Sequence, residues 1–214
     1  MGRLFNKISQ EAIAFTTSVL SRGGIAILPG DTVYGFFGRI DLPKTVERLY
    51  AIKHRERQKP LVIYTNNAKV AKWVEINTTA RVLIDAFWPQ ALSLVLPRKI
   101  GLQDWCQSNI RTQAVMTAKN PLITAIIDGL ESPIFGTTVN VSGDQSIKTA
   151  HEATRFLDDV DVMIADDDTP VYNQSSTMVD CTIEPPVIIR EEAISADKIR
   201  EIIADVRIDF GLRR

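Results

Sequence analysis

The stretch that decides the fold is Gly24-Ile-Ala-Ile-Leu-Pro-Gly-Asp-Thr-Val-Tyr-Gly-Phe36. Ile25 to Leu28 form an apolar run of strand length, which Pro29-Gly30 ends because proline and glycine are common turn residues. Before this run, apolar side chains recur at helical spacing from Ser9 to Arg22, and Gly23 can supply a left-handed helix stop. The stretch therefore predicts a helix, a buried strand and a polar turn in direct succession.

Helices and strands alternate along the rest of the chain. We expect helices over 43–52, 79–87, 121–130, about 149–157 and 195–206, and strands over 61–64, 91–96, 134–138, 160–165, 178–183 and 187–189. This order predicts an α/β fold with a twisted, mixed parallel and antiparallel sheet and flanking helices. Because no Pro/Ser/Gly-rich linker interrupts the chain, we expect a single domain over residues 1–206 and a short C-terminal tail over 207–214.

The composition is that of an ordinary soluble globular protein, with 45% hydrophobic and 24% charged residues. The net charge of -1 argues against a surface coated with nucleic-acid-binding cations, although a local basic pocket is compatible with it. Cys106 and Cys181 lack the spacing of a metal site or a disulfide framework, and no apolar run reaches about 18 residues. We therefore expect a cytoplasmic protein that binds neither a membrane nor a metal through its own ligands.

A basic run, Lys53-His54-Arg55-Glu56-Arg57-Gln58-Lys59, has two interpretations. It could be a solvated helix end, where cations suit the negative pole of the helix dipole. Lys53, however, lies seven positions after Val46 and so faces the apolar side of its helix, which is costly unless an anion or carboxylate meets the ammonium group. Lys53 and Arg55 could converge on one ligand only if the helix ends at Lys53 and the chain becomes extended, because residues two apart do not share a helix face.

Polar groups also follow the strand expected at 134–138. Thr138-Val139-Asn140 is, taken alone, most often a cap or a turn, and Ser142-Gly143 continue it. The acidic run at 166–168 lacks the glycine and terminal glutamate of a calcium loop and is expected to be a solvated loop. Because no G-x-x-x-x-G-K-[ST] pattern occurs, an ATP site in this chain is not of the P-loop kind.

In their order, these segments resemble the motifs of the YrdC-type threonylcarbamoyl-adenylate synthases. That family reads P-T-[DE]-T-V-Y-G-L, K-x-R, P-L, F-W-P, L-T-L-V-L, S-x-N-x-S-G, S-T-V-V-D and I-L-R. The corresponding segments here are Pro29 to Phe36, Lys53 to Arg55, Pro60-Leu61, Phe87 to Pro89, Leu92 to Leu96, Thr138 to Gly143, Ser176 to Asp180 and Ile188 to Arg190. Each string is weak alone, but eight in sequence are hard to produce by chance.

The resemblance implies a YrdC-like fold and an ATP-dependent reaction. The family combines L-threonine, bicarbonate or CO2, and ATP into threonylcarbamoyl-AMP and pyrophosphate, for the t6A modification of tRNA. Lys53 and Arg55 would be the catalytic groups, with Mg²⁺ carried by the nucleotide, and RNA and downstream tRNA-modification proteins are further candidate partners. The implied substrate- and nucleotide-binding residues are Asp31, Thr32, Tyr34, Thr138, Asn140, Ser142, Ser176 and Arg190.

Some positions depart from the family pattern. Gly30 stands where the family has a hydroxyl residue, Met116 where it has arginine, and Ala118 where it has proline. Methionine cannot pair with a carboxylate or phosphate. Three hypotheses therefore stand: a threonylcarbamoyl-AMP synthase with a divergent pocket, a paralogue that makes another carbamoyl or acyl adenylate or none, and a nucleotide or double-stranded RNA binding module. In each case we expect Lys53, Arg55, Thr32, Thr138 and Asn140 to converge on one cavity.

Overall fold

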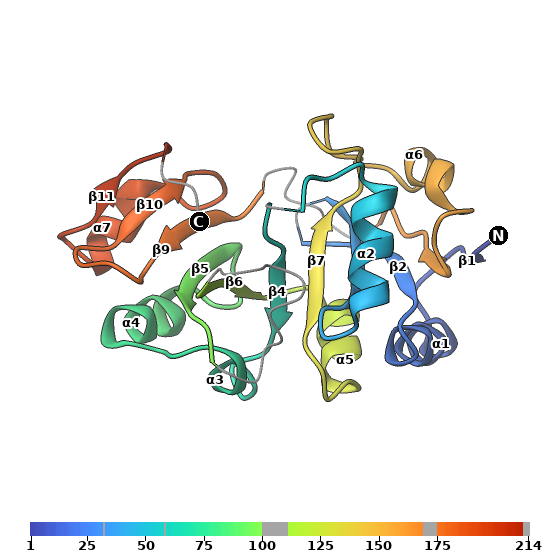
Figure 1. Cartoon of the computed structure of the whole chain (residues 1–214), viewed down its shortest axis with the longest axis horizontal. Coiled ribbons are helices and arrows are strands. Elements are labelled where there is room, and N and C mark those ends of the chain that lie inside the picture. Colours follow the sequence, from blue (N-terminus) through green and yellow to red (C-terminus); the bar gives the residue numbers. More distant parts are fainter. Residues whose placement is uncertain (32, 58, 100–110, 169–174, 212–214) are drawn as a thin grey trace.

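The computed structural model describes residues 1–31, 33–57, 59–99, 111–168 and 175–211. Its strands join in one eleven-stranded sheet with helices around it (Figure 1). The strands are β1 (Arg3–Phe5), β2 (Ile25–Pro29), β3 (Tyr34–Arg39), β4 (Val62–Thr65), β5 (Leu92–Pro97), β6 (Thr112–Thr117), β7 (Ile134–Thr138), β8 (Val162–Ile164), β9 (Thr177–Asp180), β10 (Val187–Arg190) and β11 (Arg207–Ile208). The helices are α1 (Gln10–Ser21), α2 (Pro43–Ile52), α3 (Val70–Trp73), α4 (Thr78–Phe87), α5 (Pro121–Asp128), α6 (Ala150–Ala153) and α7 (Ala196–Ile202), and a 3-10 turn, η2, covers Thr154–Phe156.

The sheet mixes parallel and antiparallel pairs. From edge to edge its order is β1-β8-β2-β3-β7-β4-β6-β5-β9-β10-β11. In the middle, β2, β3, β7 and β4 pair antiparallel in turn. β1 with β8, β8 with β2, β4 with β6, and β5 with β9 pair in parallel. The predicted α/β domain with a mixed sheet is confirmed.

The sheet separates two apolar cores, and β2 contributes to both. Ile25 and Ile27 belong to the larger core, whereas Ala26 and Leu28 belong to the other, because successive side chains of a strand point to opposite faces. Helices α2, α4, α6 and α7 supply apolar side chains to the first core, and α1 and α5 supply them to the second. α1 and α5 also pack against one another (Figure 1). β2 is therefore buried on both faces, as its continuous apolar sequence predicts.

Helices α1 and α5 begin at polar caps. The Ser9 hydroxyl accepts a hydrogen bond from Ala12 N at the start of α1, and Asn120 accepts one from Leu122 N at the start of α5. Pro121 follows Asn120 at the first helical position, where its missing N–H costs nothing. Among the described residues, no helix is both long and apolar enough to cross a membrane.

Several element predictions need correction. β3 (Tyr34–Arg39) and β6 (Thr112–Thr117) are strands that the sequence pattern did not predict. Gly35 and Gly38 weaken the strand signal of β3, although β2 and β7 pair with it on its two sides. α7 ends at Ile202 rather than near 206. Residues 207–208, predicted to belong to a C-terminal tail, form the exposed edge strand β11. Backbone hydrogen bonds to β10 hold this strand, and such bonds leave no apolar pattern in the sequence.

Gly136 in β7 lies against an aromatic ring of the neighbouring strand. A Cβ added at this position would lie 2.2 Å from Tyr64 Cε2 and 2.5 Å from Tyr64 Cδ2. We expect Gly136→Ala to lower the free energy of unfolding by about 1–3 kcal/mol, the usual cost of overpacking, as measured by urea denaturation. In a Tyr64→Ala background the same change should cost much less, because the ring is gone. Equal costs in the two backgrounds would show that the clash is not the cause.

Candidate functional site

A cavity of about 730 Å³ opens beside the central strands of the sheet. Its volume is within the usual range of small-molecule sites. Strands β3, β4, β6 and β7 and the segment after α2 contribute to its wall, and the segments around β9 and β10 complete it. The cavity thus joins parts of the chain that are more than 150 residues apart, from Gly30 to Arg190.

Two aromatic rings and two glycines form an apolar part of the cavity wall. Phe37 and Tyr64 meet edge to face, with ring centroids 5.3 Å apart and an interplanar angle of 81°. Gly35 and Gly136 lie beside these rings and also line the cavity. Phe37 and Tyr64 line the cavity although the sequence pattern did not predict them as site residues. The two-residue period of a strand could have placed Phe37 on the same face as Gly35.

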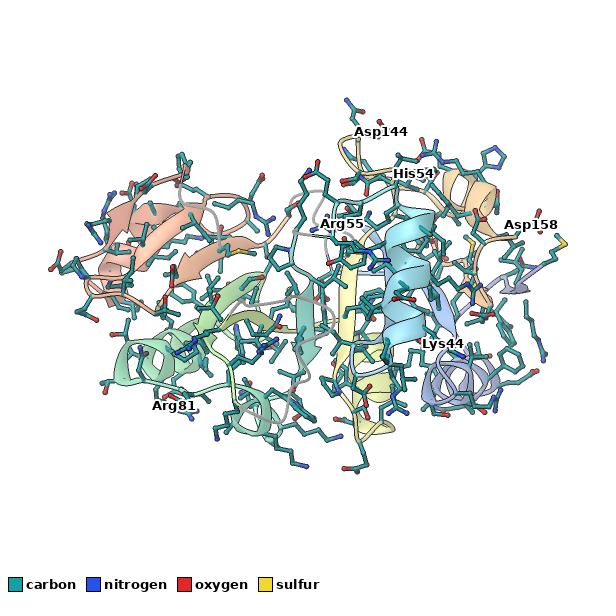
Figure 2. All side chains as sticks on the ribbon, viewed as in Figure 1. Lys44, His54, Arg55, Arg81, Asp144 and Asp158 are labelled. Carbon is teal, nitrogen blue, oxygen red and sulfur yellow. The ribbon has the colours of Figure 1, made fainter. Side chains whose placement is uncertain are left out.

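Arg55 brings a guanidinium group to the rim of the cavity. Its Nε donates to Lys59 O (3.2 Å) and its Nη2 donates to Pro60 O (2.8 Å), so the side chain closes the loop that follows α2. Lys59 also lines the cavity and forms an ion pair with Glu56 at 3.2 Å. Figure 2 shows Lys44 near the lower end of α2, and His54 and Arg55 near its upper end.

A helix stop turns Lys53 and Arg55 in different directions. His54 has a φ of 47°, in the left-handed region. His54 N donates to Ala51 O (3.1 Å) and Arg55 N donates to Tyr50 O (2.9 Å), which is the hydrogen-bond pattern of a Schellman motif. The helix therefore ends where the sequence analysis required, but through a left-handed residue rather than an extended chain.

Lys53 is buried and does not line the cavity. Its side chain is 1% exposed, and its Nζ donates to Thr138 O (2.6 Å), Asn140 O (3.0 Å) and Asn140 Oδ1 (2.7 Å). The partners of this lysine are thus oxygens of the chain itself, not the anion or carboxylate that its sequence position suggested. Burial, followed by the nearby positive charge of Arg55, lowers the pKa of Lys53 to about 7.

The other predicted residues divide between the cavity wall and its frame. Tyr34 and Thr138 line the cavity. Asn140 does not; its amide Oδ1 accepts from the Thr138 hydroxyl (2.9 Å) as well as from Lys53. Ser142 lies outside the wall and donates its backbone N–H to Lys53 O (2.8 Å). Lys53, Thr138 and Asn140 contact one another, but only Thr138 of the three lines the cavity, so the predicted convergence on the cavity does not hold for Lys53 and Asn140. Thr32 lies outside the described residues.

Asp31 and Tyr34 fix the turn that follows β2. The Asp31 carboxylate accepts from Lys119 N (2.9 Å) and Asn120 N (2.6 Å), so it ties this turn to the start of α5 rather than lining the cavity. Burial raises the pKa of Asp31, and these two backbone hydrogen bonds oppose that shift. The Tyr34 hydroxyl donates to Asp167 Oδ1 (3.0 Å) and accepts from Asp166 N (3.0 Å). Burial raises the pKa of Tyr34, so it stays a neutral phenol.

Ser176 and Arg190 lie on the cavity wall, where the structure also places Met116. Arg190 donates from Nε to Ser176 O (2.9 Å) and from Nη2 to Ser176 Oγ (3.0 Å). Burial lowers the pKa of Arg190, although a guanidinium remains charged at neutral pH. Among the described residues, no three His, Cys, Asp or Glu side chains gather as a metal site. The cations of the wall, Arg55, Lys59 and Arg190, suit an anionic ligand.

The mixed sheet and its cavity define a YrdC-like α/β domain. A model of the Sua5/YciO/YrdC family, described as Telomere recombination, matches residues 18–192. The chain belongs to this family, as the resemblance of its motifs predicted.

Curated relatives and solved structures agree with this assignment. The chain is 27% identical over 205 residues to the threonylcarbamoyl-AMP synthase of Pyrococcus abyssi, covering 94% of this chain and 60% of that protein. It is 28% identical over 176 residues to the threonylcarbamoyl-AMP synthase of Pseudoalteromonas translucida, covering 80% of this chain and 94% of that protein. P. abyssi Sua5 complexed with L-threonine superposes with a TM-score of 0.90 at 25% identity, over 99% of this chain and 64% of that one. E. coli YciO shares the fold, with a TM-score of 0.81 at 18% identity, over 93% of this chain and 100% of that one.

The chain spans only part of some of these relatives. It covers about three fifths of the length of the synthases of P. abyssi and Bacillus subtilis, 60% and 59% respectively.

The buried Lys53 predicts a pH-dependent stability term. Its pKa is about 7 in the folded protein and returns to its ordinary value of 10.5 on unfolding, so between these values the unfolded chain binds the extra proton. The unfolding free energy of the wild type should therefore rise with pH in this window, by up to about 1.4 kcal/mol per pH unit. Lys53→Met lacks this rise. The unfolding free energy of the wild type minus that of Lys53→Met, measured by urea denaturation, should be about 2 kcal/mol larger at pH 9 than at pH 6.

Lys44→Met is the matched control, since Lys44 is an exposed lysine at the start of the same helix. Its difference from the wild type should not change with pH in this way. Parallel pH profiles for the wild type and Lys53→Met would contradict the lowered pKa of Lys53.

Proposed function

We propose that this chain forms threonylcarbamoyl-AMP and pyrophosphate from L-threonine, bicarbonate or CO2, and ATP. The observation that carries the proposal is that Arg55 and Arg190, 135 positions apart in the sequence, lie on the wall of one cavity together with the Thr138 hydroxyl. A triphosphate needs such separated cations, because its charge extends over several ångströms. Family membership and the names of the relatives support the same reaction.

The reaction needs positioning and charge neutralisation more than a nucleophilic side chain. The threonine amine captures CO2 as a carbamate, whose oxygen attacks the α-phosphorus of ATP, and pyrophosphate leaves with the electron pair of the broken P–O bond. Arg55 and Arg190 would bind the phosphate oxygens, where guanidinium can form two parallel hydrogen bonds. Lys53, first predicted to be catalytic, instead holds the main chain at Thr138 and Asn140, so we assign it a positioning role.

The nucleotide would carry its own Mg²⁺. Glu56 is the carboxylate on the described cavity wall, and it is paired with Lys59. Because Mg²⁺ commonly keeps several waters and binds substrate phosphates, it enters as part of the substrate. The product would serve the t6A modification of tRNA, which places the protein in the cytoplasm with downstream tRNA-modification proteins as partners.

Pyrophosphate release tests the proposal directly. The protein is incubated with ATP and Mg²⁺, and release is compared with and without L-threonine and bicarbonate. We expect release only when both are present. ATP binding in calorimetry without threonine-dependent release would instead support the alternative, a nucleotide or double-stranded RNA binding module. RNA binding is then measured by titration with a short duplex.

Arg55→Ala should weaken ATP binding at least about tenfold, because a hydrogen bond to a charged group contributes about 1.5–3 kcal/mol. Calorimetric titration with ATP measures the change. Arg57→Ala is the matched control, because Arg57 is an exposed arginine of the same loop that does not line the cavity. The role of Arg55 is refuted by ATP affinities that are equal in Arg55→Ala and Arg57→Ala.

A further inference from the structure

Four side chains, three from strands and one from the residue before β9, form a continuous row of hydrogen bonds. Arg190 Nη2 donates to Ser176 Oγ (3.0 Å), and Ser176 Oγ lies 2.8 Å from Ser93 Oγ. Ser93 Oγ donates to Met116 Sδ at 3.5 Å. The row crosses the sheet from β10 past β9 and β5 to β6, which are adjacent in the strand order. Arg190, Ser176 and Met116 line the cavity, whereas Ser93 is 0% exposed and lies behind it.

The chemistry of the two ends fixes the direction of this row. A guanidinium can only donate hydrogen bonds, and a thioether sulfur can only accept them. Each serine hydroxyl has one proton. All three hydrogen bonds can form together only if Ser93 gives its proton to Met116, and Ser176 gives its own proton to Ser93 and accepts from Arg190. Every hydroxyl proton of the row is then used, in one direction, from the arginine to the methionine.

We propose that Met116 and Ser93 are positioning residues that set Arg190 and Ser176 for ligand binding through this directed row. Ser176 has no proton left for the cavity, so it offers only a lone pair there. Arg190 keeps Nη1, for which the described part of the chain shows no partner. This end of the cavity is therefore built for a ligand that carries an anion beside an N–H or O–H donor. The positioning stands on the hydrogen bonds alone, and the identity of the ligand rests on the proposed function.

Met116 supplies the acceptor that the buried Ser93 hydroxyl needs. The hydroxyl of Ser93 is fully buried, and a buried hydroxyl without an acceptor costs free energy. An arginine at position 116 could only donate hydrogen bonds. The Ser93 hydroxyl would then lose the sulfur that now accepts its proton. The methionine thus changes the polarity of the row, in addition to removing a positive charge from the cavity.

The test measures the order of the Arg190 side chain separately from ligand binding. The Nε–H signal of Arg190 is followed by NMR in protein labelled with ¹⁵N-arginine and is assigned by its loss in Arg190→Lys. We expect Ser93→Ala to broaden or shift this signal and to weaken ATP binding about fivefold to tenfold, because Arg190 loses the fixed orientation of its acceptor. Ser93→Thr, which keeps the hydroxyl, should restore both properties. Met116→Leu, which removes only the acceptor sulfur at similar volume, should move the signal in the same direction as Ser93→Ala.

Thr16→Val is the matched control for loss of a buried hydroxyl. Thr16 is 0% exposed in α1, and its hydroxyl has no hydrogen-bond partner among the described residues. Neither the Arg190 signal nor ATP affinity should change in this variant. An Arg190 signal in Ser93→Ala that equals that of the wild type overturns the proposal. If the signals change as expected but the wild type does not bind ATP, the positioning row stands and the proposed function fails.

Discussion

One buried ammonium group joins the parts of the chain on which the cavity depends. Lys53 lies at the end of α2, yet its three hydrogen bonds go to the backbone and amide oxygens of Thr138, the last residue of β7, and Asn140, just after β7. These contacts fix the helix end, from which Arg55 reaches the rim, against the strand end, from which Thr138 reaches the wall. Because burial of a lysine is costly unless acceptors meet all of its donors, the geometry of this junction is tightly specified. The two sides of the cavity are therefore held by an interaction that the cavity itself does not contain.

Lys53 also shows how far a sequence pattern reaches. Its seven-residue spacing from Val46 placed it correctly on the apolar face of the helix, since helical periodicity is a local property. The chain oxygens that accept its hydrogen bonds could not be predicted, because they lie 85 and 87 positions away and leave no pattern in the sequence. The same distinction explains the strands. The apolar run of β2 was recognised because both of its faces are buried, whereas β11 is exposed and depends on backbone pairing with β10.

The candidate site was predicted mainly through the order of family motifs, and the structure sorts those motifs by what their polar groups contact. The cavity is lined by Tyr34, Arg55, Thr138, Ser176 and Arg190. Outside its wall, Asp31, Lys53 and Asn140 form hydrogen bonds with other parts of the chain. Sequence alone could not separate the two groups, because a motif records which residues recur and not which way they point. Phe37 and Tyr64 were missed for a related reason. Their rings meet across β7, which lies between β3 and β4 in the sheet, and this neighbourhood is not visible in the sequence.

The separation between residues that line the cavity and residues that hold the chain suits a reaction in which the substrates must be aligned. Attack of a carbamate on a phosphorus atom needs no side-chain nucleophile, so catalytic advantage comes from fixed cations and from the exclusion of alternative geometries. A frame of buried, fully bonded polar groups supplies that rigidity, since moving any member would leave a donor or acceptor unpaired. Met116 belongs to this frame although it lies on the wall. Its sulfur accepts a hydrogen bond from Ser93, which links Met116 to the row that begins at Arg190. In the proposed row, Met116 therefore orients one cation of the wall without adding another.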